Sequence, residues 1–188
     1  MRRKIIMSVI LILLIIILGY KHYINNYSNE GIFNNVTDRN GYILNQVQES
    51  VKVKLFIKPE WIPFNSDEII EMNEKLLEVH STNIILSRVW NRGNDIYFSF
   101  ETTYNMNYSK GEFLYNGTFN ENGTFSWVSK MDGIKLYDKR QKIFEKGQHG
   151  RGPNSAFGFG IEPESYKDIE EGFYIDYTEF ILYKYIKK

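Results

Sequence analysis

The hydrophobic pattern separates an apolar N-terminal segment from a mixed remainder. Residues 5–19 read IIMSVILILLIIILG, and only Ser8 and Gly19 interrupt the run of large apolar side chains. A helix of this length covers about 22 Å, so it must continue through residues 20–24 to cross a hydrocarbon core of about 30 Å. Because Ile and Leu occupy all its faces, it lacks the polar side of a soluble amphipathic helix. The pattern predicts a transmembrane helix over residues 5–24.

The charges that flank this segment predict its orientation. Residues 1–4 carry three positive side chains, whereas Lys21 is the one charge that follows directly. Positive flanks stay in the cytoplasm, so the main domain is expected on the extracytoplasmic side. A cleaved signal peptide is the alternative, but residues 20–23 are large where a cleavage site requires small side chains. We therefore expect an uncleaved signal anchor and a single-pass protein of the cell membrane.

The segment after the anchor predicts a linker followed by one domain. Residues 25–40 are rich in Asn and lack periodicity, which is typical of a linker. Residues 41–188 are about the size of one ordinary domain. Within it, residues 51–57 place Val, Val, Leu and Ile on alternate positions, which predicts a half-buried strand.

One helix is predicted over residues 65–80. Asn65 is a candidate N-cap, with Glu68 three residues later in the position of a capping box. Apolar residues then recur at helical spacing: Ile69, Ile70, Met72, Leu76, Leu77 and Val79. The pattern predicts that this helix ends near His80.

The rest of the chain predicts strands joined by short turns. Residues 96–104 alternate between apolar and polar positions, and Asn122-Gly123 is a good hairpin turn because both residues tolerate positive φ. Further strands are expected at 84–90, 113–119, 125–127, 134–137, 143–144, 156–161 and 173–186. The predicted fold is a mainly-β (α+β) domain, with an antiparallel sheet or β-sandwich and one helix.

Composition and charge restrict the possible chemistry. The chain has no Cys, which excludes disulfides, thiolate nucleophiles, Cys-based zinc sites and a lipidated-Cys anchor. Its 23 basic and 23 acidic residues give a net charge of zero, without the basic excess of nucleic-acid binders, so we expect no nucleic-acid partner. Abundant Ile, Lys, Asn and Tyr are typical of an AT-rich coding genome, and a low-GC bacterium is the expected source.

The most unusual segment is the glycine-rich loop over residues 147–154. In this loop a histidine such as His149 is expected to titrate near neutral pH, and Arg151 is able to bind a carboxylate or phosphate through two hydrogen-bond donors. Asn154 adds a polar side chain. The segment lacks the Gly-Lys-Ser/Thr ending of a phosphate-binding loop. We predict these three residues as a ligand-binding site, against the alternative of a flexible connection without function.

Other motifs favour structure over catalysis. The acidic run over residues 162–171 lacks calcium-loop spacing, the three histidines form no zinc motif, and Gly-x-Ser-x-Gly is absent. We therefore predict no catalytic residue, no metal site and no cofactor. Six aromatic residues could form a sugar-stacking platform, although core positions are the expectation for them: Tyr97, Tyr104, Tyr115, Trp127, Tyr183 and Tyr185.

Three functions follow as hypotheses, because no family resemblance emerges from these residues. The first is a non-enzymatic, membrane-tethered binding or sensing domain with a protein or cell-wall partner. The second is a cell-envelope hydrolase that acts on glycan or peptide. The third is an immunity-type protein against a toxin or phage.

Overall fold

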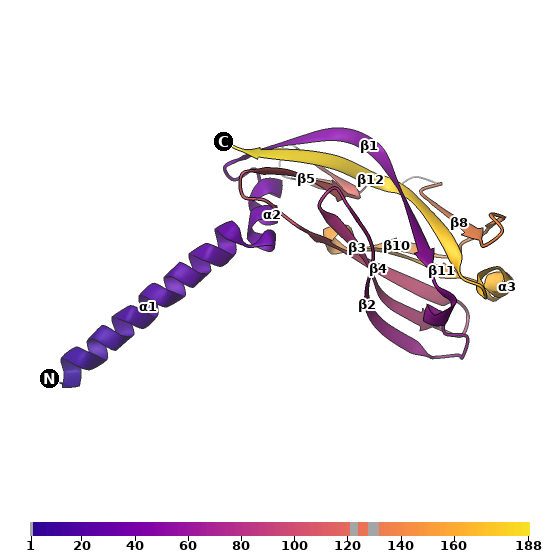
Figure 1. Ribbon diagram of the computed structural model, residues 1–188, viewed down its shortest axis with the longest axis horizontal. Helices are drawn as coiled ribbons and strands as arrows, with labels where there is room; N and C mark the ends of the chain where they lie inside the picture. The colour runs from indigo at the N-terminus through magenta and orange to yellow at the C-terminus, as the bar shows by residue number, and fades with distance from the viewer. Residues whose placement is uncertain (1, 121–123, 128–131) are drawn as a thin grey trace.

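Two helices lead into two antiparallel sheets in the computed structural model, which describes residues 2–120, 124–127 and 132–188, with residues 2–5 and 8 described by backbone alone. Helix α1 (Arg2–Tyr27) projects away from the sheets, and the short helix α2 (Asn29–Thr37) packs against them (Figure 1). The predicted turn at Asn122-Gly123 lies outside the described residues.

Helix α1 has the length and composition of a membrane span. Among the described residues it is the one helix that is both long enough and apolar enough to cross a membrane. Its segment Val9–Tyr27 has a mean hydropathy of 1.6, and no residue of that segment is buried. At 1.5 Å per residue its 26 residues extend about 39 Å, which exceeds a hydrocarbon core of about 30 Å.

Helix α2 occupies the segment that was expected to be an irregular linker. Ser28 has extended backbone angles, and its hydroxyl accepts a hydrogen bond from the Gly31 N–H at 3.0 Å, which caps the helix. Val36 lies four residues after Ile32 and three after Phe33, and all three side chains are buried against the β domain. Only these three apolar positions carry the helical pattern, and the surrounding asparagines conceal it.

The first sheet centres on the C-terminal strand. Strand β12 (Phe173–Lys187) pairs along its length with β1 (Tyr42–Ile57) and on its other side with β8 and then β5. The sheet has the order β1-β12-β8-β9, with β5 paired to β12, and its remaining strands are β5 (Lys110–Tyr115), β8 (Ile134–Asp138) and β9 (Ile143–Phe144).

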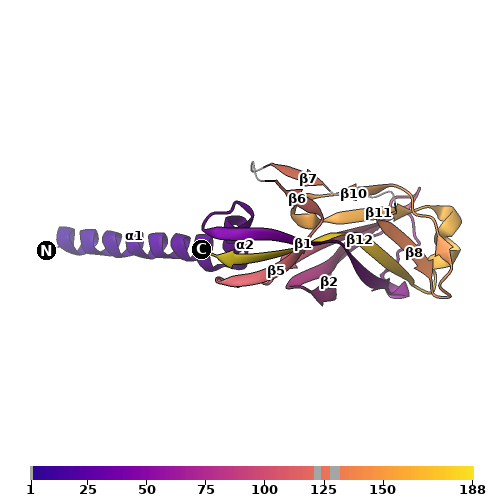
Figure 2. The same cartoon turned by 90° about the horizontal axis from the view of Figure 1, so that it is seen from above.

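The second sheet lies beneath the first in Figure 1, and its order is β10-β11-β4-β3-β2. Its strands are β2 (Ile69–Val79), β3 (Thr82–Asn91), β4 (Ile96–Tyr104), β10 (His149–Arg151) and β11 (Phe157–Ile161). A separate ribbon pairs β6 (Gly117–Phe119) with β7 (Phe125–Trp127) beside the first sheet (Figure 2). Single turns complete the fold: η1 (Pro59–Trp61), η2 (Pro153–Ser155), η3 (Pro163–Ser165) and α3 (Tyr166–Ile169).

The helix predicted over residues 65–80 is wrong, because this segment forms edge strand β2. It pairs with β3 from Ile69–Trp90 to Val79–Thr82, with register shifts between Glu71 and Glu74 and between Lys75 and Leu77. Each irregularity interrupts the two-residue alternation of the strand. The apolar side chains therefore recur at intervals that resemble a helix.

Two hydrophobic clusters hold the domain together. The larger one lies between the sheets, where Phe98, Phe100 and Phe159 of the second sheet and Ile57 and Phe173 of the first are almost fully buried. The alternation predicted for residues 96–104 is confirmed, because the even-numbered residues are buried and the odd-numbered residues between them are half-buried or exposed.

The smaller cluster, called the aromatic cluster below, joins α2 to the ends of both sheets. It comprises Ile32, Phe33, Val36, Tyr42, Leu44, Tyr104, Met106, Phe113, Tyr115, Ile181, Tyr183 and Tyr185. Four of the six aromatic residues considered as a sugar platform thus belong to the core. Of the other two, Tyr97 is half-buried and Trp127 is 45% exposed.

Candidate functional site

The glycine-rich loop is an edge strand rather than a free connection. Its backbone is tied to β11, since the Gly147 N–H donates to the Gly160 carbonyl at 2.9 Å and the Gly160 N–H donates to the Gln148 carbonyl at 2.7 Å. His149 pairs with Phe159, and Arg151 pairs with Phe157. Strand β10 therefore presents its side chains at the edge of the core between the sheets.

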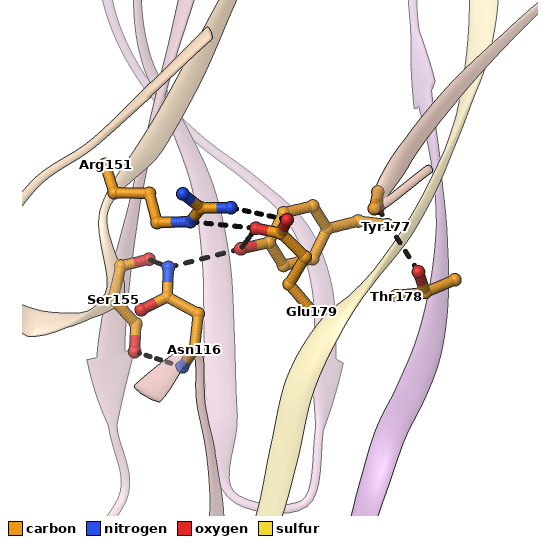
Figure 3. Close-up of polar contacts among 7 residues, drawn as sticks. Asn116, Arg151, Ser155, Tyr177, Thr178 and Glu179 are labelled. Atoms are coloured by element: carbon orange, nitrogen blue, oxygen red, sulfur yellow. Dashed lines mark hydrogen bonds and ion pairs between the residues drawn. The ribbon is translucent and has the colours of Figure 1, made fainter. Parts of the chain in front are cut away.

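Arg151 forms a bidentate ion pair that connects the two sheets. Its Nε donates to Glu179 Oε2 at 2.9 Å, and its Nη2 donates to Oε1 at 2.5 Å (Figure 3). The Glu179 side chain is only 2% exposed and that of Arg151 15%. Since Arg151 comes from β10 and Glu179 from β12, this pair fixes the edge of one sheet to the centre of the other.

A buried hydrogen-bond network surrounds the pair (Figure 3). The Tyr177 hydroxyl donates to Glu179 Oε2 at 3.3 Å, and Asn116 Nδ2 donates to the Tyr177 hydroxyl at 3.2 Å. Burial first, and then the charge of Glu179, raise the pKa of Tyr177 above its usual range. Tyr177 therefore stays protonated and acts as a neutral donor to the carboxylate.

The same network holds a strained turn next to Arg151. Asn154 and Ser155 have φ values of 53° and 62°, in the left-handed region. Asn116 contacts Ser155 twice: its backbone N–H donates to Ser155 Oγ at 3.0 Å and its Nδ2 to the Ser155 carbonyl at 3.2 Å. These contacts offset a backbone strain of about 1–3 kcal/mol per residue.

Asn154 lies at the wall of a groove beside α2. Its carbonyl accepts hydrogen bonds from the Thr102 hydroxyl at 2.5 Å and the Tyr104 hydroxyl at 3.3 Å. The groove, called the α2 groove below, has a volume of about 270 Å³ and lies between α2 and β4. Its polar lining is made of amides, hydroxyls and one carboxylate, from Asn29, Glu30, Asn34, Thr102, Thr103, Tyr104, Asn105 and Asn154.

His149 remains on the surface. Partial burial first, and then the positive charges of Lys146 and Arg151, lower the pKa of this imidazole below its usual value. The three predicted residues thus lie in different surroundings: Arg151 in an internal ion pair, Asn154 at the α2 groove and His149 exposed. Their role in ligand binding stays a prediction.

The buried partners of Arg151 could not be assigned from the sequence. Glu179 is 28 residues away and Asn116 is 35 residues away in the opposite direction. The one usable signal was Glu179 itself, which with Asp176 is one of two carboxylates among the apolar and aromatic residues of β12. Within the described residues, no group of three or more His, Asp or Glu side chains is placed to hold a metal ion.

No protein-family model, no curated protein and no solved structure matches this chain.

Removal of one member of the buried ion pair should destabilise the protein far more than removal of an exposed one. Arg151→Met leaves the Glu179 carboxylate buried without its guanidinium, at an expected cost of about 3–5 kcal/mol. The matched control is Arg88→Met, whose partner Glu71 lies 2.8 Å away with side-chain exposures of 51% and 65%, at a cost of about 1 kcal/mol or less. Denaturant unfolding of the detergent-solubilised chain measures both.

A double variant separates the charge from the packing. Arg151→Met combined with Glu179→Leu removes both charges, and it should recover most of the stability that Arg151→Met loses. Equal losses for Arg151→Met and Arg88→Met would contradict the assignment of a buried inter-sheet pair.

The protonation of His149 gives a second prediction. A lowered pKa means that the unfolded chain binds this proton more readily than the folded chain does. The contribution of neutral His149 to the free energy of unfolding is therefore fully present above the usual histidine pKa, and it is lost as the pH falls through the lowered pKa of the folded chain. An NMR titration of the His149 ring protons should give a pKa below that of free histidine, and Lys146→Gln should raise it. A pKa at or above the free value would contradict the described surroundings.

Proposed function

We propose that the protein is a membrane-anchored, extracytoplasmic binding or sensing domain. The length and apolarity of α1 support the anchor, and the three positive residues before it support a cytoplasmic N-terminus. The two sheets then form a sandwich-like body outside the membrane, held by a single-pass helix. The partner is a protein or a cell-wall component.

The observation that carries this proposal is the position of α2 between the anchor and the groove. Only Ser28 separates the end of α1 from the start of α2. Helix α2 also supplies Asn29, Glu30 and Asn34 to the α2 groove. A ligand in this groove therefore contacts α2 directly, and the short corner joins α2 to α1.

The groove lining indicates the chemistry of the ligand. Amide and hydroxyl groups donate and accept hydrogen bonds without a dominant charge. Phe33 and Tyr104 add apolar surface to the same groove. This combination suits a neutral, hydrogen-bonding ligand such as a wall glycan or an extended peptide.

The hydrolase hypothesis draws less support from the geometry. Glu179, the carboxylate beside Arg151, is almost completely buried and already binds a guanidinium, so it is poorly placed to act on a substrate. An immunity-type function also uses a binding surface, and it would differ in its partner, a toxin or phage protein.

The proposed orientation is testable because the chain contains no Cys. We expect a membrane-impermeant maleimide to label Asn94→Cys, on the exposed turn before β4, in intact cells. The cysteine-free parent is the control for background. Labelling that requires cell lysis would place the domain in the cytoplasm and overturn the proposed location.

The proposed groove is testable by photo-crosslinking in the producing cell. A benzophenone amino acid at Asn105, an exposed position of the groove lining, should yield a discrete adduct with protein or wall material. The matched control at Asn94, also exposed, should not yield it. The same adduct from both positions, or none from Asn105, would count against the groove.

A further inference from the structure

Three tyrosines and one lysine join α1 to the β domain at a single point. The rings of Tyr27 and Tyr108 stack with centroids 4.7 Å apart, and Lys187 Nζ lies 3.2 Å from the centroid of the Tyr108 ring. The Tyr42 hydroxyl donates to the Tyr108 carbonyl at 2.8 Å. These four residues, called the junction cluster below, leave no free linker between the anchor and the domain.

The length of α1 places the junction cluster at the level of the lipid headgroups. The predicted span ends at Ile24, and Tyr27 follows three residues later, about 4.5 Å further along the helix. The headgroup region on each side of a bilayer is about 5–8 Å thick. Tyr27 therefore lies within the headgroup region, and Tyr108 stacks against it.

The end of the chain brings further basic and apolar side chains to this point. The Lys187 N–H donates to the Ser109 carbonyl at 2.8 Å, and the Lys188 N–H donates to the Gly41 carbonyl at 3.0 Å. Figures 1 and 2 show the C-terminus beside α2 and the end of α1. Lys110 pairs with Ile186, which is 49% exposed.

The charge of this surface is complementary to an anionic membrane. Lys110, Lys187 and Lys188 supply three positive side chains within a few residues of the junction cluster. The nearest acidic residue on β5, Glu112, is bound by His80 at 2.6 Å and approached by Lys184 at 3.6 Å. Tyrosines beside lysines are typical of the membrane–water interface, where the ring packs near lipid and the charge meets the headgroup.

We propose that this end of the β domain docks on the outer leaflet and binds anionic lipid headgroups through Lys110, Lys187 and Lys188. The proposal rests on the membrane anchor proposed above and names the lipid surface as a second partner of the domain. Docking fixes the tilt of the domain, and it leaves the α2 groove and the distal end around α3 free for another partner.

The test uses the full chain in nanodiscs of pure phosphatidylcholine or with phosphatidylglycerol added. A fluorophore on Ser109→Cys, next to Tyr108, reports quenching by headgroup-nitroxide lipid. We expect strong quenching that increases with phosphatidylglycerol, and no quenching at the control position Asn94→Cys. A label on Gly19→Cys should be quenched in every lipid, because it reports insertion of the anchor alone.

Charge variants identify the lysines that bind lipid. The double variant Lys110→Gln with Lys188→Gln should lower the ratio of docked to undocked domain by about 25-fold, because each lysine contributes a factor of about five. The matched control, Lys139→Gln with Lys167→Gln, removes two exposed lysines at the distal end and should leave the ratio of docked to undocked domain unchanged.

Each other outcome overturns the proposal in a recognisable way. If quenching at Ser109 depends neither on lipid charge nor on the lysine substitutions, α1 alone holds the domain near the membrane. A Ser109 label that is shielded only when two copies share a nanodisc would identify a second copy as the occupant. Failure of the Gly19 label to be quenched would instead refute the membrane anchor itself.

Discussion

The burial of α2 in the aromatic cluster is the contact on which the arrangement of this protein depends. Phe33 stacks on Tyr104 with ring centroids 4.4 Å apart and an angle of 2° between the planes, and it meets Phe113 edge-on at 5.4 Å. Truncation of a buried Phe typically costs about 3–5 kcal/mol, which is a large fraction of the stability of a small domain. Because α2 follows α1 after a single residue, this packing also sets where α1 leaves the domain.

The corner between the helices is equally restricted. A Cβ atom on Gly31 would lie 2.1 Å from the Ile24 carbonyl oxygen, so only Gly permits α2 to approach α1 so closely. Asn35 Nδ2 donates to the Asn25 carbonyl at 2.7 Å, and the Met106 N–H donates to Asn29 Oδ1 at 2.8 Å. Helix α1, the corner and the β domain are therefore joined by packing and hydrogen bonds, and the α2 groove forms where they meet.

The Arg151–Glu179 pair plays a different role from the aromatic cluster. A buried ion pair gains little net stability over apolar residues of similar size, because desolvation offsets most of the attraction. Its geometry is nonetheless specific, since the bidentate contact fixes β10, and the hydrogen bond from Asn116 to Ser155 fixes the turn after it. The consequence is a defined wall for the α2 groove at Asn154.

Regular patterns made parts of this structure predictable from sequence. The apolar run of α1 is almost unbroken and the alternation over 96–104 follows one period, and both predicted elements are present. Strand β2 was mistaken for a helix because two irregularities disrupt its period, and α2 was missed because three apolar residues stand among asparagines. In the candidate site, the residue types of His149, Arg151 and Asn154 marked them as candidate ligand-binding residues. The partners of Arg151 and the groove beside Asn154 arise from long-range packing, which the sequence pattern does not show.

A distance measurement tests the rigid connection between α1 and the β domain most directly. Spin labels on Leu18→Cys in α1 and Asn94→Cys in the domain allow the distance between them to be measured by double electron–electron resonance on the full chain in nanodiscs. The structure predicts one narrow distance distribution, which Gly31→Ala should broaden and Gly19→Ala, with no atom within 4 Å of its added Cβ, should leave unchanged. A broad distribution in the parent chain would show a flexible tether and would contradict the account.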